Sequence, residues 1–238
     1  MSAATPSRPR AGRGTFESNG RPVQVERFEP PVAARAAALI LHGADGLAYR
    51  GPSYRELARG LADDGLLALL VHYFDSTGDG FQAFLTEPFR FMTWMQAVAD
   101  GVGYARTQFG AGPAVGLVGF SLGAYLSLAV AAQDERVGAV VDVFGGLHDL
   151  LVPGVTRLPP VLILHGDADP VVPVSEAHKL EKLLQRLGTP HEKHIYPGLG
   201  HAFYGAAAED AFRRMAAFLT RHLVARQGEP PGLPRRSS

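Results

Sequence analysis

Residue types that together can carry out nucleophilic catalysis occur in this sequence, each in a segment rich in small residues. Ser121 is the centre of a Gly-x-Ser-x-Gly pattern, Asp167 and Asp169 lie in His-Gly-Asp-Ala-Asp-Pro, and His201 follows Gly-Leu-Gly. A serine hydroxyl becomes a nucleophile when a histidine removes its proton, and a carboxylate holds that histidine in the required tautomer. The combination predicts acyl transfer through an acyl-serine intermediate.

The segment around Ser121 favours a sharp turn between a strand and a helix. The apolar run Ala114–Val118 leads into the motif, and an apolar stretch that includes Leu126 and Val130 follows it. Flanking glycines leave space for a serine on a tight turn at the start of a helix. The alternative is a glycine-rich turn whose serine only caps the helix. The strand–turn–helix setting favours the nucleophile.

The candidate acid and base follow later strands. Asp167 and Asp169 come after the apolar run Val161–Leu164, and His201 lies between the last strand and the C-terminal helix. Either carboxylate can orient the histidine, and the other then serves a turn or a helix cap. The chain order Ser, Asp, His differs from the orders of chymotrypsin and subtilisin.

A loop after the first buried strand is suited to stabilise developing negative charge. The run Ala36–Leu41 leads into His42-Gly43-Ala44-Asp45-Gly46. Acyl transfer places negative charge on an oxygen, which two backbone N–H groups can stabilise. We expect these N–H groups to belong to Leu122, at a helix N-terminus, and to Ala44. The alternative is a connection without a catalytic role.

The remaining histidines carry no catalytic motif. We expect His42 and His165 to hold loop backbone in place, while His148 lies in a loop that could approach the site. No pair of histidines stands with a carboxylate at zinc-ligand spacing, and the chain has no cysteine, so we expect no metal. Neither Gly-x-Gly-x-x-Gly nor a lysine-bearing phosphate loop is present, and we expect no cofactor.

Composition limits the classes of partner. The 238 residues include 23 Lys plus Arg and 23 Asp plus Glu, so no basic surplus favours nucleic acid or an anionic membrane. No apolar run has the length of a membrane span or of a signal-peptide core. We therefore expect a cytoplasmic protein that acts on a small molecule. Residues 14–226 should form the domain, between disordered tails at 1–13 and 227–238.

The pattern along the chain predicts an α/β fold. Asn19-Gly20 marks a hairpin between Thr15 and Phe28, after which apolar strands alternate with helices. This order predicts a mostly parallel sheet of about eight strands with helices on both faces and no lid domain. The expected later strands are Ala36–Leu41, Leu66–Val71, Ala114–Val118, Val137–Phe144, Val161–Leu164 and Glu192–Tyr196. The expected helices are Ser53–Asp63, Glu87–Gln108, Leu122–Gln133, Ser175–Leu187 and Ala207–Arg226.

Taken together, these segments resemble the dienelactone hydrolase family of the α/β-hydrolase superfamily, from Ala36 to the C-terminal helix. The resemblance rests on five segments: His42-Gly43, Val71-His72-Tyr73-Phe74, Gly119-Phe120-Ser121-Leu122-Gly123, His165-Gly166-Asp167-Ala168-Asp169-Pro170 and Gly200-His201-Ala202-Phe203. It implies the α/β-hydrolase fold, Asp169 as the triad acid and the Ala44 N–H as the second oxyanion donor.

Two departures from the family pattern bear on the substrate. Ser121 stands where the family has a cysteine, and Gly43 stands where it has a glutamate that tunes that cysteine. The two losses are mutually consistent, because a serine needs its histidine as base. The resemblance therefore implies hydrolysis of a small ester or lactone rather than of dienelactone itself. Alternatives are a thioesterase or small peptidase with the same triad, and a non-catalytic binding protein of this fold.

Aromatic residues near predicted strand ends could form a compact pocket. The candidate wall residues are Tyr73, Phe74, Phe120 and Phe203, with Trp94 and Arg90 at the mouth, although each is also a normal core residue. The segment Asp75–Glu87 is the longest candidate flap. We expect a preference for short acyl esters or small lactones over long-chain lipids.

Overall fold

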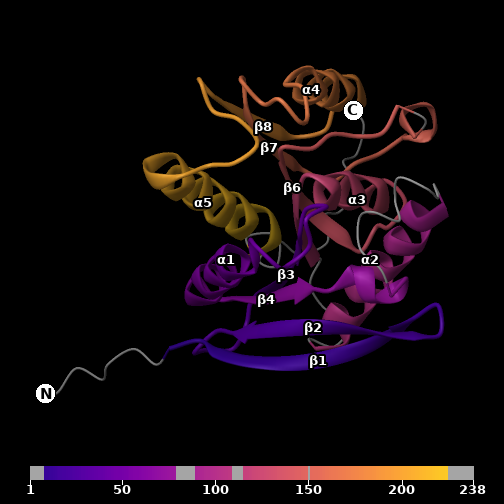
Figure 1. Cartoon of the computed structure of the whole chain (residues 1–238), viewed down its shortest axis with the longest axis vertical. Coiled ribbons are helices and arrows are strands. Elements are labelled where there is room, and N and C mark those ends of the chain that lie inside the picture. The colour runs from indigo at the N-terminus through magenta and orange to yellow at the C-terminus, as the bar shows by residue number, and fades with distance from the viewer. Residues whose placement is uncertain (1–7, 79–88, 109–114, 150, 225–238) are drawn as a thin grey trace, which may run out of the picture.

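A sheet runs through the centre of the protein with helices packed on both faces (Figure 1). A computed structural model describes residues 8–78, 89–108, 115–149 and 151–224. Its strands are β1 (Arg10–Ser18), β2 (Arg21–Glu29), β3 (Ala36–Leu41), β4 (Leu66–Val71), β5 (Val115–Phe120), β6 (Val137–Val143), β7 (Val161–Gly166) and β8 (His191–Tyr196). Its α-helices are α1 (Gly51–Asp63), α2 (Phe89–Thr107), α3 (Leu122–Ala131), α4 (Ser175–Leu187) and α5 (Gly205–Leu219). Short helical turns cover Tyr73–Ser76, Val152–Gly154 and Thr220–Val224.

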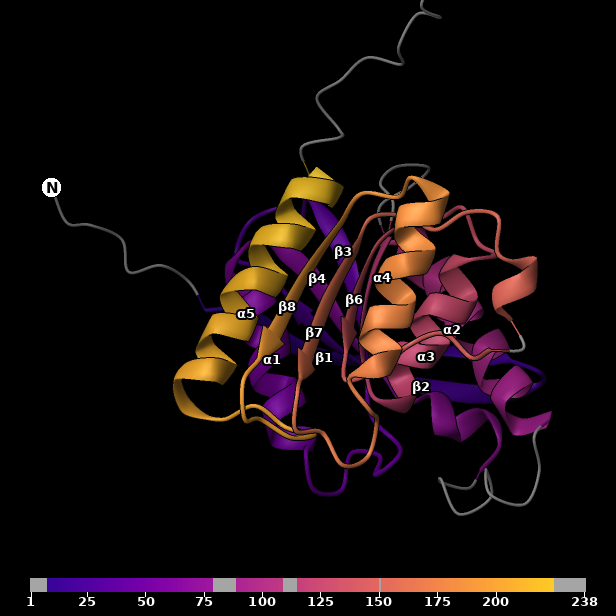
Figure 2. The same cartoon turned by 90° about the horizontal axis from the view of Figure 1, so that it is seen from above.

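The strand order β1-β2-β4-β3-β5-β6-β7-β8 is the mostly parallel arrangement that the sequence predicts. Strands β3 to β8 are parallel to one another, whereas β2 is antiparallel to both β1 and β4. Most of the parallel strands are buried on both faces, which explains their nearly continuous apolar sequences. Helices α1 and α5 cover one face, and α2, α3 and α4 cover the other (Figure 2).

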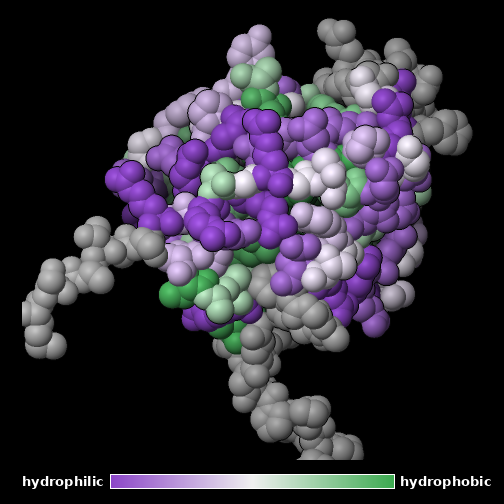
Figure 3. Space-filling model, turned by 90° about the horizontal axis from the view of Figure 1, so that it is seen from below, coloured by the Kyte–Doolittle hydropathy of each residue, from purple (hydrophilic) through white to green (hydrophobic). Residues whose placement is uncertain are grey.

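The N-terminal hairpin is longer than expected. Asn19 and Gly20 both have positive φ, 51° and 73°, as a two-residue hairpin turn requires. From this turn the pairing continues out to Arg10 opposite Glu29, so residues 10–13 belong to β1 and not to a tail. Backbone hydrogen bonds between β1 and β2 extend β1 although most of its side chains are exposed. The face seen from below is accordingly mostly hydrophilic, with small hydrophobic patches (Figure 3).

The other expected elements lie within a few residues of their predicted bounds. The predicted flap Asp75–Glu87 is described only as far as 78, where Tyr73–Ser76 forms a helical turn; the rest lies outside the described residues. The predicted C-terminal tail lies outside them as well. Within the described part of the chain, no helix combines the length and the apolar character needed to span a bilayer.

The topology brings distant segments together at one edge. The loops after β3, β5, β6, β7 and β8 all leave the carboxyl ends of parallel strands, the edge where ligands bind in open α/β sheets. Four of these loops hold the candidate site residues. The oxyanion loop follows β3, the serine motif follows β5, the two aspartates follow β7, and His201 follows β8.

Candidate active site

Ser121 occupies a strained turn between β5 and α3. Its backbone has φ 52° and ψ −117°, a conformation that non-glycine residues seldom adopt and that costs ~1–3 kcal/mol. The Ser121 N–H donates to the Val143 carbonyl at 2.8 Å, which ties the turn to the neighbouring strand β6. A side chain at Gly119 would collide with the backbone of Gly123 and Ala124 across the turn, and one at Gly123 with the backbone at the end of β3, so both flanking positions require glycine.

The three predicted triad side chains form one hydrogen-bonded chain. His201 Nδ1 lies 2.7 Å from Asp169 Oδ2, and His201 Nε2 lies 2.9 Å from Ser121 Oγ. Because an ionised carboxylate only accepts hydrogen bonds, Nδ1 carries the proton when Asp169 is ionised. Nε2 is then free to accept the serine hydroxyl proton, which is the arrangement that activates a serine.

The two candidate carboxylates, Asp169 and Asp167, have different surroundings and different hydrogen-bond partners. Asp169 is buried, and its second oxygen, Oδ1, accepts the N–H groups of Val171 and Val172 at 2.8 and 3.0 Å. Burial raises the pKa of Asp169, but the hydrogen bonds from His201 and from these two N–H groups outweigh burial, so the pKa is lowered overall. Asp167 is exposed and accepts the Gly198 N–H at 2.6 Å, as a residue that stabilises a turn does.

Three side chains hold the loop after β3 in place. The Gly43 N–H donates to the Tyr54 hydroxyl at 3.1 Å, and the Tyr73 hydroxyl donates to the His42 carbonyl at 2.8 Å. His42 Nδ1 lies 2.8 Å from the Gly43 carbonyl, which can only accept, so Nδ1 carries the proton. Burial lowers the pKa of His42 to about 4, so its ring is neutral near pH 7. His42 therefore holds loop backbone, as the sequence suggests.

Two backbone donors lie near the serine, the Ala44 N–H on this loop and the Leu122 N–H at the start of α3. Gly43 is so close that a Cβ built on it would lie 3.6 Å from the Ser121 Cβ. The Gly43 carbonyl also accepts the Gly46 N–H at 3.0 Å, which fixes the peptide plane and with it the direction of the Ala44 N–H. Within the described part of the chain, neither Ala44 N–H nor Leu122 N–H has a hydrogen-bond acceptor. Both are available to an oxyanion.

The predicted aromatic pocket is partly wrong. Tyr73 and Trp94 are each 0% exposed and belong to the core beneath the sheet, where they pack together at 6.0 Å between ring centroids. Because they are fully buried, these two side chains cannot line a substrate-binding surface. Phe74 is partly buried and packs edge-on against His42 at 4.7 Å. Phe120 and Phe203 do line a cavity, which lies between α1 and α5.

Phe144 is a site residue that the sequence does not reveal. It follows β6 with φ 56°, a second strained non-glycine residue beside Ser121. Its ring lies 5.2 Å from the His201 ring and 4.3 Å from the Phe203 ring, between centroids, so it packs against one side of the His201 imidazole. A phenylalanine at the end of an apolar strand gives no sequence signal of this backbone conformation.

The other histidines near the site have structural partners. His165 is buried and its Nε2 lies 2.9 Å from the Val172 carbonyl, so it holds the loop that also binds Asp169. Burial is the main reason that the pKa of His165 is lowered. His72 pairs with Glu26 at 3.1 Å, and His148 lies on the loop after β6.

A carboxyl buried behind the site has no hydrogen-bond partner among the described residues. Asp142, on β6, is 0% exposed, and neither of its oxygens is bonded. Burial raises the pKa of Asp142 from 3.8 to about 8. Between these values the folded state holds a proton that the unfolded state has lost. The contribution of Asp142 to the free energy of unfolding therefore falls as pH rises through this range, by ~1.4 kcal/mol per unit of pKa difference.

Asp142→Asn should remove this part of the pH dependence. We expect urea denaturation at pH 5 and pH 8.5 to show a much smaller loss of stability in Asp142→Asn than in the wild type, because asparagine does not titrate. Asp149→Asn, at an exposed position on the following loop, is the matched control and should retain the wild-type slope. An unchanged slope in Asp142→Asn would show that Asp142 is ionised in the folded protein.

Comparison with known proteins identifies first the fold and then the family. The fold is the α/β-hydrolase fold, with a TM-score of 0.75 to a dienelactone hydrolase from Anabaena variabilis, 22% identical over 91% of this chain and all of that one. A dienelactone hydrolase-like promiscuous phosphotriesterase from metagenomic libraries gives a TM-score of 0.76 at 20% identity over 91% of this chain and all of that one. At these identities the likeness establishes the fold alone.

The sequence comparison establishes the family. Residues 27–223 match the sequence profile of the dienelactone hydrolase family, so the chain belongs to this family of hydrolases. Acyl-protein thioesterase 1 from Gibberella zeae is 30% identical over 115 residues, which are 45% of this chain. The match spans about half, 47%, of that relative.

Proposed function

We propose that this protein is a serine esterase that hydrolyses esters or lactones of small molecules through an acyl-serine intermediate. The observation that carries the proposal is the hydrogen-bonded chain Ser121–His201–Asp169, with distances of 2.9 and 2.7 Å. A serine so connected, on a strained turn at a helix N-terminus, has both a base and an electrostatic setting for attack on a carbonyl.

In the acylation step, Ser121 Oγ attacks the carbonyl carbon of the ester while His201 Nε2 takes the hydroxyl proton. The carbonyl oxygen becomes negative, and the N–H groups of Leu122 and Ala44 stabilise it. His201 then gives its proton to the leaving alcohol as the carbon–oxygen bond breaks. In deacylation His201 Nε2 takes a proton from a water molecule, whose oxygen attacks the acyl carbon. His201 then returns the proton to Ser121 Oγ as the acyl–oxygen bond breaks, and the carboxylic acid leaves. Asp169 keeps the His201 ring in one tautomer and stabilises its charged form.

A thioesterase is the second candidate, and the relative named acyl-protein thioesterase 1 is the observation that favours it. The same triad would attack a thioester, whose thiolate leaves with less need for a proton from His201. The short matched region makes the oxygen ester the stronger proposal.

A substrate panel tests the proposal. We expect measurable kcat/KM for p-nitrophenyl acetate and for a small aliphatic lactone, and far slower turnover of a matched anilide, because an amine is a poorer leaving group than an alcohol. Turnover of the matched thioester far above that of the ester would favour the second candidate. Turnover of the anilide alone would contradict esterase activity.

A further inference from the structure

A cavity of about 640 Å³ lies between α1 and α5, within the range of about 300–1,000 Å³ typical of small-molecule sites. Its inner surface is apolar and includes Leu57, Phe120, Ala208 and Met215. None of these side chains takes part in the hydrogen-bonded chain of the triad. The cavity therefore has no role in the chemical steps described above.

The inner end of this cavity is formed by residues that contact the triad. Phe120 is the neighbour of Ser121, and Phe144, which also lines the cavity, lies 5.2 Å from the His201 ring. Tyr54 lines it too, packs on Phe120 at 5.1 Å and binds the oxyanion loop through Gly43. Two wall residues of the cavity therefore adjoin the triad, Phe120 through the chain and Phe144 through its ring.

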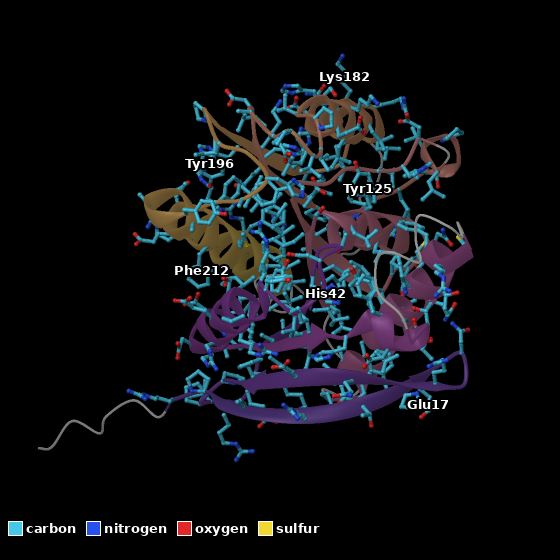
Figure 4. The ribbon with its side chains drawn as sticks, in the orientation of Figure 1. Glu17, His42, Tyr125, Lys182, Tyr196 and Phe212 are labelled. Carbon is cyan, nitrogen blue, oxygen red and sulfur yellow. The ribbon has the colours of Figure 1, made fainter. Side chains whose placement is uncertain are left out.

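Gly60 is the last residue of α1 that lines the cavity, and Phe212 of α5 lies against it. The Phe212 side chain points from α5 toward α1 (Figure 4), where its ring lies over Gly60, and a Cβ on Gly60 would be 2.6 Å from that ring. Because Gly60 has no side chain, the Phe212 ring can occupy this position. From Tyr54 to Gly60 the helix rises by about 9 Å, which is the length of wall that an extended apolar group can follow.

The charged residues of the cavity lining are two arginines and two glutamates, and both arginines have carboxylate partners outside the lining. Arg50 and Arg213 carry positive charge, and Glu56 and Glu209 carry negative charge. Arg50 is paired with Asp45 at 3.2 Å, and Arg213 with Asp210 at 3.3 Å. Such a rim offers no unpaired positive charge to an anionic group, and the apolar interior favours a neutral hydrocarbon.

We infer that the cavity between α1 and α5 is the subsite for the apolar group of the substrate. The substrate is thus an ester bearing a neutral, medium-sized hydrocarbon group, such as a hexanoyl or octanoyl chain or an aromatic ring. The inference rests on the proposed esterase function and names its substrate class. The hydrocarbon can belong to the acyl half or to the alcohol half of the ester.

The test fills or lengthens the cavity without touching the triad. Ala208→Phe places a ring inside it, Phe212→Ala removes its far wall, and Ala217→Phe, on the exposed side of the same helix, is the matched control. The measurement is kcat/KM for p-nitrophenyl esters from acetate to dodecanoate, and for the corresponding series of alkyl acetates.

We expect the wild type to have a higher kcat/KM for six- and eight-carbon groups than for the shortest group, in the series that varies the half of the ester bound in the cavity. Ala208→Phe should lower kcat/KM for these by about tenfold or more and change acetate by about twofold or less, because only the longer group needs the space. Phe212→Ala should move the optimum to longer chains, and Ala217→Phe should match the wild type. The series that responds identifies the half of the ester that occupies the cavity.

Two failures are distinguishable. Normal turnover of acetate with chain-length profiles that are the same in the wild type and all three variants would overturn this inference and leave the esterase intact. An equal loss on acetate and octanoate in Ala208→Phe would overturn it too, because the ring would then disturb the triad and not a subsite. Absence of turnover for every ester would refute the proposed function, and this inference with it.

Discussion

Ser121→Ala should lower kcat by about 1,000-fold or more, because it removes the atom that attacks the carbonyl. The rest of the site should survive the change. Alanine can occupy the strained turn as serine does, and the N–H bond to the Val143 carbonyl does not involve the side chain. The remaining rate, which the N–H groups of Leu122 and Ala44 still support, should exceed that in water.

The measurement is steady-state kcat on p-nitrophenyl acetate, together with Tm and circular dichroism to verify the fold. Ser127→Ala is the matched control, since Ser127 lies on α3 and donates only to the Gly123 carbonyl within its own helix. It should retain activity close to that of the wild type. Activity of Ser121→Ala near the wild-type level, in a folded protein, would rule out the acyl-serine mechanism.

Asp169→Asn should have the second large effect, a loss in kcat on the order of 10⁴-fold. Oδ1 of Asp169 accepts the N–H groups of Val171 and Val172, and the amide oxygen of asparagine must keep that place. The amide NH₂ then faces His201 Nδ1 and donates to it. The imidazole is forced into the tautomer with its proton on Nε2, and it can no longer accept the proton of Ser121.

Asp167→Asn is the matched comparison, two residues away in the same loop. Its oxygen can still accept the Gly198 N–H, so kcat should stay within about tenfold of the wild type. If Asp167→Asn proved the more damaging of the two, the acid would be Asp167, and the bond seen between Asp169 and His201 would have no catalytic role.

The parts of the site that follow strands directly were predictable from the sequence. Glycines around Ser121 and the loop position of His201 carry local signals, because tight turns restrict which residues fit. The parallel sheet was predictable for a similar reason, since strands buried on both faces must be apolar throughout. The choice between Asp167 and Asp169, in contrast, needed the family resemblance, because both aspartates follow the same strand.

The walls of the cavity could not be predicted in this way. Tyr73 and Trp94 lie near strand ends like Phe120, but the helical turn Tyr73–Ser76 directs Tyr73 under His42 and into the core. Phe144 lines the cavity from a position with positive φ, which its sequence context does not indicate. The cavity itself lies between α1 and α5, helices that are far apart in the sequence, so no local pattern marks it. The first part of β1, residues 10–14, was missed because backbone pairing, and not an apolar side-chain pattern, extends the strand there.

Covalent labelling with a fluorophosphonate tests most directly whether Ser121 is an activated nucleophile. After brief exposure of the wild-type protein to a small alkyl fluorophosphonate, intact mass spectrometry should show one adduct, and peptide mapping should place it on Ser121. Labelling should parallel the loss of esterase activity and be absent in Ser121→Ala. An adduct on another residue, or full esterase activity in a protein that takes up no label, would contradict the assignment of Ser121 as the nucleophile.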